Sequence, residues 1–256
     1  MLGATKQSRC VIAKINDKKI SMQYIVYDLE TTGLDYTKEQ PIEIGIIKVD
    51  DNGQVEEHDI FVKTKEPLSE DTKRITNITD AMLAAQGIGL AEALEKAFAV
   101  LGIGRDGFDN NTIIIGHNIL GFDNLFLQRF ARELGYSFPL KKNFYDTAGE
   151  FRARLLGEKT YVYESKADFH ERVLRLENKS VRYNLAAACA HYGIPMNETA
   201  HRANVDCRYT LKVFEKQNGL TLLKEDSLLI PAISPSQPIM PTIKNDANGG
   251  QGAFNF

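Results

Sequence analysis

The chain has 256 residues, of which 43% are hydrophobic and 25% charged, and its net charge is -3. This ordinary globular composition with an acidic balance excludes a protein that binds nucleic acid mainly through a basic surface. No apolar run approaches the roughly 18 residues of a membrane span, the first 21 residues lack an apolar signal segment, and the three cysteines lack metal-ligand spacing. We therefore expect no membrane association and a reducing, cytoplasmic location.

Residues 1–22 form a predicted N-terminal extension, in which Cys10–Ile15 begins either a hairpin or a short helix. Three neighbouring antiparallel strands follow, because apolar and alternating stretches are separated by short turns. The predicted strands are Tyr24–Tyr27, Pro41–Val49 and His58–Lys63.

Helical periodicity dominates the rest of the chain, with two further short strands between the helices. Capped helical turns begin at Ser69 and Thr79. The predicted helices are Leu90–Leu101, Phe122–Leu134, Tyr183–Tyr192 and Asn204–Gln217, and the strands begin at Thr112 and Phe144.

Residues 150–182 are charged and mixed, and no element is assigned to them. Their basic cluster favours a solvated face over a nucleic-acid contact; it consists of Arg152, Arg154, Lys159 and Lys166. Asp146, on the short strand before this segment, is interpreted as an ordinary acid.

Two carboxylates stand at alternate positions at the end of the first predicted strand. Side chains two apart on a strand point to the same face, so Asp28 and Glu30 project together if the strand continues through Leu29. Adjacent acids at the end of an apolar strand repel each other unless a cation lies between them. The pair therefore indicates a metal site.

Three further polar residues at the ends of elements complete this pattern: Asp123, His201 and Asp206. Each alone has an ordinary explanation, as a helix-terminal acid or a surface residue. Together with Asp28 and Glu30 they indicate metal-assisted hydrolysis, in which carboxylates hold hard divalent cations and histidine acts as general base. Mg²⁺ suits such a site because it uses few carboxylates and keeps several waters.

The sequence resembles the DEDDh 3′→5′ exonucleases, which include the proofreading ε subunit of bacterial replicases, ribonuclease T and oligoribonuclease. The resemblance extends from about Ile25 to Phe214. It is carried by Asp28-x-Glu30-Thr-Thr-Gly33, by Gly116-His-Asn-x-x-x-Phe122-Asp123-x-x-Phe126-Leu127 and by His201-x-Ala203-x-x-Asp206. The second motif has three residues between Asn118 and Phe122, where two are common.

The resemblance implies an α/β, RNase H-like exonuclease fold, with a mixed five-stranded sheet flanked by helices, over residues 23–222. It also implies two divalent ions, Mg²⁺ or Mn²⁺. By that likeness Asp28, Glu30 and Asp206 bind the first ion, while Asp28 and Asp123 hold the second. His201 would deprotonate the attacking water. Thr31, Thr32 and Leu34 match positions that line the 3′-terminal nucleotide.

Residues 223–256 form a predicted disordered tail, with four prolines between Pro231 and Pro241 followed by an Asn/Gly-rich stretch. Its last six residues, 251–256, resemble the peptide that binds the bacterial sliding clamp. Gln251, Phe254 and Phe256 would be the contacts, because aromatic anchors on a flexible linker suit a groove on a partner. The other interpretation is that these aromatic residues are only a sticky, disordered end of the chain without a specific partner.

The favoured function is a metal-dependent 3′→5′ DNA exonuclease that releases nucleoside 5′-monophosphates, linked to proofreading or repair. Its partners would be a single-stranded or frayed 3′ end, the sliding clamp and a DNA polymerase. An exoribonuclease of ribonuclease T or oligoribonuclease type is the alternative within the same chemistry. A noncatalytic docking module on the clamp is the alternative of another class, which the complete set of five polar residues disfavours.

Overall fold

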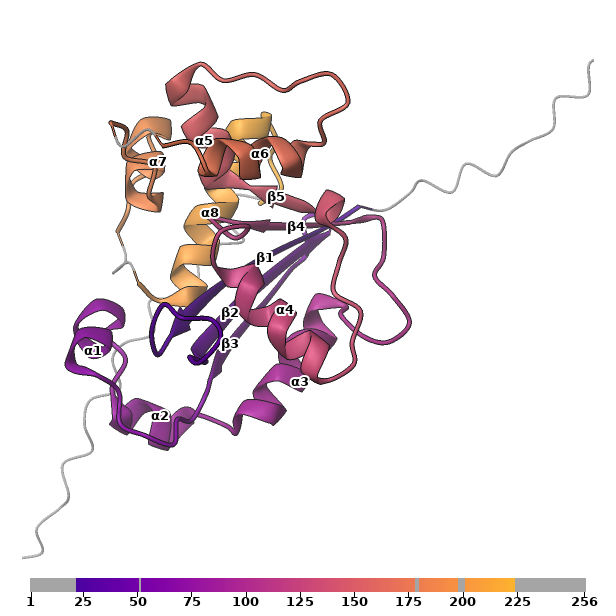
Figure 1. Ribbon diagram of the computed structural model, residues 1–256. Helices are drawn as coiled ribbons and strands as arrows, with labels where there is room; N and C mark the ends of the chain where they lie inside the picture. Colours follow the sequence, from indigo (N-terminus) through magenta and orange to yellow (C-terminus); the bar gives the residue numbers. More distant parts are fainter. Residues whose placement is uncertain (1–21, 51, 178–179, 198–200, 224–256) are drawn as a thin grey trace, which may run out of the picture. The chain divides into compact units, whose positions relative to one another are not determined.

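The computed structural model describes residues 22–50, 52–177, 180–197 and 201–223. A mixed five-stranded sheet in the order β3-β2-β1-β4-β5 lies at its centre, with helices on both sides (Figure 1). The strands are β1 (Gln23–Thr31), β2 (Pro41–Asp50), β3 (Val55–Phe61), β4 (Thr112–Gly116) and β5 (Phe144–Asp146). The predicted sheet is confirmed. The predictions for residues 1–21 and for the tail beyond Leu223 lie outside the described residues.

Strand β1 is the middle of the sheet: it pairs antiparallel with β2 and parallel with β4. The three antiparallel strands predicted at the start are confirmed. The third strand, β3, begins three residues before the predicted His58 and ends at Phe61, because its whole length pairs with β2, from Val55 opposite Val49 to Phe61 opposite Glu43.

The helices follow the predicted pattern closely, and α3 has the predicted bounds. Asn184 accepts a hydrogen bond from the backbone N–H of Ala187, so α7 starts two residues later than predicted. The α-helices are α1 (Glu70–Thr76), α2 (Asp80–Gln86), α3 (Leu90–Leu101), α4 (Asp123–Glu133), α5 (Thr147–Leu156), α6 (Lys166–Leu174), α7 (Leu185–Tyr192) and α8 (Ala203–Asn218), with a 3₁₀ turn, η1 (Lys141–Asn143). None of the described helices is long and apolar enough to cross a membrane.

The two faces of the sheet are buried by different helices, so alternate residues of β1 contact different helices. Ile25, Tyr27 and Leu29 belong to the core that β1 shares with α3 and α4. The alternate residues face α8, where the ring of Tyr24 lies 5.8 Å from that of Phe214. Asp28 and Glu30 continue this second set, so β1 delivers them to the side covered by α8.

Helix α8 begins directly against β2. A Cβ atom on Gly45 would lie 2.4 Å from the backbone carbonyl carbon of Ala203, so only glycine permits this approach. Gly45 is paired with Asp28 across the sheet. The contact therefore brings the first turn of α8 to the carboxylate end of β1, as Figure 1 also shows.

The segment 150–182, for which no element is predicted, contains most of α5 and all of α6. The prediction that this basic cluster is solvated is wrong for Arg152, whose side chain is buried; the residue is 3% exposed. Its guanidinium donates to the carbonyl oxygens of Leu174 (2.7 Å) and Leu176 (2.6 Å), at the end of α6. Burial of the arginine stem and satisfaction of helix-terminal carbonyls account for this position. Arg154, Lys159 and Lys166 are exposed, as expected.

Candidate active site

The first two carboxylates lie where β1 ends. Leu29 is buried between the half-buried Asp28 and Glu30, and the register with β2 shifts after Glu30. The strand thus continues through the motif, as predicted. The two acids project to the α8 side, while the backbone turns away immediately after them.

Asp123 is held against the same strand by its own side chain. It lies in the first turn of α4, is 4% exposed, and accepts a hydrogen bond from the backbone N–H of Leu29 at 3.0 Å. The hydroxyl of Tyr27 bonds the side-chain oxygen of Asn124, the next residue of the helix. These bonds fix the start of α4 to β1 on either side of Asp28.

Helix α8 and the residues just before it supply the rest of the site. Asp206 lies in its first turn and accepts a hydrogen bond from the backbone N–H of His201 at 3.2 Å. One potential ligand atom each from Glu30, His201 and Asp206 lie within 4.8 Å of one another. The other Asp206 oxygen, Oδ1, is buried and has no hydrogen-bond partner within the described part of the chain.

Burial and mutual repulsion make these carboxylates hard to ionise without a cation. Burial, followed by the charges of Asp206, Glu43 and Asp123, raises the pKa of Glu30 to about 8. Burial also raises the pKa of Asp123 to about 8 and that of Asp206 to about 6. For Asp28, burial and then the charges of Asp123 and Asp206 hold the pKa well above its usual range.

The donor set fits divalent ions. Glu30 and Asp206 place ligand atoms within 4.8 Å of each other and of the His201 imidazole, and the charges of both acids and of Asp123 act on Asp28. One Asp206 oxygen has no hydrogen-bond partner among the described residues. Hard cations such as Mg²⁺ and Mn²⁺ prefer oxygen ligands of this kind. The structure therefore brings together all five residues that the sequence singled out.

Asp146, interpreted from the sequence as an ordinary acid, organises the second motif. It is fully buried, and its carboxylate accepts hydrogen bonds from the backbone N–H groups of Asn118 and Leu120, both at 3.0 Å. It also caps α5 by accepting from Ala148 and Gly149. The carboxylate thereby shapes the loop that leads into Asp123. A capping pattern before α5 was the only sequence signal for it.

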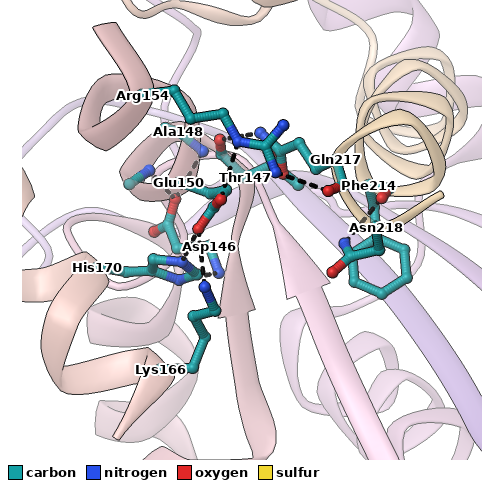
Figure 2. A network of polar contacts seen from close by, with 11 residues as sticks. Asp146, Thr147, Ala148, Glu150, Arg154, Lys166, His170, Phe214, Gln217 and Asn218 are labelled. Atoms are coloured by element: carbon teal, nitrogen blue, oxygen red, sulfur yellow. Dashed lines mark hydrogen bonds and ion pairs between the residues drawn. The ribbon is translucent and has the colours of Figure 1, made fainter. Parts of the chain in front are cut away.

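A network of polar contacts around the buried His170 and Glu150 supports Asp146 (Figure 2). The backbone N–H of Asp146 donates to Nδ1 of His170 at 3.2 Å, so the other ring nitrogen carries the proton in the neutral imidazole. That nitrogen lies 3.1 Å from Glu150. Although burial opposes ionisation, bonds from His170, Lys166 and Arg154 lower the pKa of Glu150 to about 2.

The residues expected to line the 3′-terminal nucleotide occupy the last position of β1 and the loop after it. The Thr31 hydroxyl donates to the carbonyl of Gly33 at 2.7 Å, and that of Thr32 donates to Glu39 at 2.5 Å. Leu34 is 85% exposed. The two hydroxyls shape the loop, while Leu34 presents an apolar surface to solvent beside the site.

A hollow of about 370 Å³ borders the same end of the sheet. It is lined by His117, Asn118 and residues 181–185. Because Val26 pairs with Ile115 in the parallel register, His117 lies level with Asp28. A larger hollow of about 460 Å³, between residues 63–67 and α2, contains none of the predicted site residues.

Comparison with known families agrees with this geometry. The exonuclease family model, RNase T, matches residues 25–214. The chain belongs to the DEDDh-type 3′→5′ exonuclease family. The match covers all three motifs and every residue of the carboxylate cluster.

The relatives that the chain matches include PolC-type DNA polymerases III of bacteria, which are much longer than this chain. The chain is 27% identical over 225 residues to the PolC-type DNA polymerase III of Ureaplasma parvum, covering 84% of this chain and 13% of the polymerase. It is 26% identical over 205 residues to that of Clostridium perfringens, covering 80% and 12%. The chain thus spans only a small part of these proteins.

Solved structures of exonuclease I share the fold. One matches with a TM-score of 0.57 at 17% identity, covering 78% of this chain and 41% of that one. E. coli exonuclease I in complex with a dA16 oligonucleotide matches with a TM-score of 0.55 at 18% identity, covering 77% and 42%. The RNase H-like exonuclease fold implied by the motifs is confirmed.

The raised pKa values predict that metal-free stability falls as pH rises. Between the usual carboxyl pKa near 4 and the folded values of about 6 to 8, the folded state binds more protons than the unfolded state. In EDTA, the melting temperature should therefore fall between pH 5.5 and 8.5. Mn²⁺ should restore it most strongly at the upper end, because the ion replaces the protons.

Differential scanning fluorimetry across this pH range measures both effects. Asp28→Asn should raise the metal-free melting temperature at pH 8.5 by about 3 °C and remove most of the response to Mn²⁺. Glu92→Gln, at an exposed position of α3, is the matched control and should behave like the wild type. A metal-free stability that increases steadily up to pH 8.5 would contradict this account of the cluster.

Proposed function

We propose that this protein is a metal-dependent 3′→5′ DNA exonuclease that releases nucleoside 5′-monophosphates and acts in proofreading or repair. The observation that carries the proposal is the cluster at the carboxyl end of β1. Glu30, His201 and Asp206 place ligand atoms within 4.8 Å of one another, and the charges of Asp123, Asp206 and Glu30 act on Asp28. DNA is favoured as the substrate because the relatives are DNA polymerases and a fold neighbour was solved with a DNA oligonucleotide. The same role would place the chain in the cytoplasm, where the sequence predicts it.

Each site residue has a role in this reaction. Asp28, Glu30 and Asp206 would hold one divalent ion, and Asp28 with Asp123 a second. Bound there, the ions supply charge stabilisation at the scissile phosphate and lower the pKa of the attacking water. Water oxygen attacks phosphorus, the bond from phosphorus to the 3′ oxygen of the penultimate nucleotide breaks, and that oxygen takes up a proton.

His201 suits the role of general base. It is exposed at the rim of the cluster, within reach of Glu30 and Asp206, and a surface imidazole can pass the proton of the attacking water to solvent. Leu34 would contact the terminal base through its exposed side chain, while Thr31 and Thr32 would keep the loop that presents it in shape.

Hydrolysis of 3′-terminal nucleotides tests the proposal. Purified protein with Mg²⁺ or Mn²⁺ should shorten 5′-labelled single-stranded DNA and mispaired duplex DNA one nucleotide at a time, and EDTA should stop it. Asp28→Ala should abolish turnover, and His201→Ala should lower kcat by about 100-fold or more. Glu92→Gln should retain wild-type rates.

Parallel reactions on RNA of the same sequence distinguish the alternatives. A rate on RNA well above that on DNA would overturn the DNA assignment and favour an exoribonuclease. Metal-replete wild-type protein that cuts neither polymer would overturn the enzymatic proposal and leave a noncatalytic module.

We also propose that the last six residues bind the bacterial sliding clamp and that the chain works beside a DNA polymerase. Gln251, Phe254 and Phe256 lie outside the described residues, so this proposal is supported by their spacing and by the replicative relatives. Tethering to a clamp would raise the concentration of the enzyme at primer ends.

Deletion of residues 251–256 should abolish retention of the protein on immobilised clamp while leaving the hydrolysis of free single-stranded DNA unchanged. Surface plasmon resonance of the full chain, the deletion and the double variant Phe254→Ala/Phe256→Ala measures this. Equal retention of all three would refute the clamp motif.

A further inference from the structure

A fifth carboxylate lies beside the four that form the cluster. Glu43 of β2 is fully buried and pairs with Glu30 in the antiparallel register, on the same face of the sheet. A buried acid next to other acids is strongly unfavourable unless specific partners neutralise it. Glu43 belongs to none of the three motifs, so its presence at this position requires another explanation.

Two partners of Glu43 belong to the beginning of α8, and a third, Asp59, lies beside it on β3. The guanidinium of Arg202 donates through Nε to both carboxylate oxygens, at 2.9 and 3.2 Å, and its Nη2 lies 2.9 Å from Oε1. The backbone N–H of Ala203 donates to Oε2 at 3.1 Å. One carboxylate therefore forms an ion pair with the residue that starts the helix and accepts from its first N–H group.

Helix α8 needs such an acceptor from elsewhere. Its N-cap residue is Arg202, which provides no side-chain capping bond. Helix N-termini carry unsatisfied N–H groups and a partial positive charge, and a carboxylate stabilises both. Glu43 thus performs, from the neighbouring strand, the function that Ser, Thr or Asp performs at other helices. Gly45, two residues on, removes the Cβ that would hold the helix away.

This anchor fixes the two site residues on either side of it. His201, immediately before Arg202, has a φ of +66°, a left-handed conformation that is uncommon for residues with a side chain and here lies at the turn into α8. Asp206 lies one turn into the helix and accepts from the His201 backbone. Any rotation of the first turn of α8 would move both away from Glu30.

We propose that Glu43 is a positioning residue for the exonuclease reaction: by pairing with Arg202 and capping α8, it aims His201 and Asp206 at Glu30 and Asp28. The inference rests on the proposed function for its catalytic consequence. Its consequence for metal binding does not depend on which substrate is cut.

The test compares Glu43→Ala and Glu43→Gln with Glu57→Gln. Glu57 is the matched control, because its 2.7 Å ion pair joins β3 to Arg208, in the second turn of the same helix. Its one contact with the first turn among the described residues is a 3.5 Å hydrogen bond from the Asn204 amide, which glutamine can still accept. For each full-length variant, we would measure Mn²⁺ binding by electron paramagnetic resonance, the melting temperature, and kcat and KM on single-stranded DNA. Mn²⁺ binding and kinetics are measured at a temperature where the variant is folded.

Glu43→Ala should weaken Mn²⁺ binding and lower kcat by about tenfold or more each, while KM stays within about twofold. Glu43→Gln retains one acceptor for the Ala203 N–H and should show a smaller loss of both. Glu57→Gln should lower the melting temperature with unchanged kcat and Mn²⁺ affinity.

The proposal would be overturned if folded Glu43→Gln and Glu43→Ala both keep the wild-type kcat and Mn²⁺ affinity and differ from the wild type only in a lower melting temperature. If Glu43→Ala does not fold, the Mn²⁺ affinity and kcat of Glu43→Gln alone decide whether the proposal holds. A wild-type protein that binds Mn²⁺ but cuts no nucleic acid would refute the proposed function, and Mn²⁺ affinity would still judge Glu43.

Discussion

Repulsion among carboxylates at the end of β1 is the constraint on which the rest of the site depends. Asp28, Glu30, Asp123 and Asp206 are brought together where burial already opposes their ionisation, so the pKa of each is raised. Such a cluster lowers the stability of the fold at neutral pH unless cations occupy it. Its retention in a well-packed sheet is a physical argument for function.

Hydrogen bonds and ion pairs outside the cluster hold the elements that carry these acids in place against that repulsion. Asp123 is held by the backbone of Leu29, and the loop before it is held by the buried carboxylate of Asp146. The start of α8 is held by Glu43 and Arg202. Because these contacts involve rigid strands and helix ends, the cluster is set before any ion binds, which is how metal sites achieve geometry.

The sequence predicted the residues of the cluster because they are defined locally. Asp28 and Glu30 are two apart on one strand, and the spacing of His201 and Asp206 is that of a known family, which the motif around Asp123 matches except for one extra residue. The apolar pattern of α3 likewise determined both of its ends, since a helix depends on contacts within itself and with one face. Strand β3 was placed too late because the length of a strand depends on its partner.

The supporting residues could not be found in the same way. Glu43 and Arg202 are 159 positions apart, and Asp146 acts on a loop 26 and 28 residues before it. A single sequence does not show which distant groups will meet. Arg152 was assigned to solvent because arginine is usually exposed, whereas here the carbonyls at the end of α6 give its guanidinium a buried partner.

The most direct test of the central claim is anomalous X-ray scattering from crystals soaked in Mn²⁺ with a nucleoside 5′-monophosphate. The account predicts two peaks roughly 4 Å apart, one contacted by Asp28, Glu30 and Asp206 and the other by Asp28 and Asp123, and neither in Asp28→Asn crystals. Density for the nucleotide at the end of β1 without any Mn²⁺ peak among these carboxylates would contradict it.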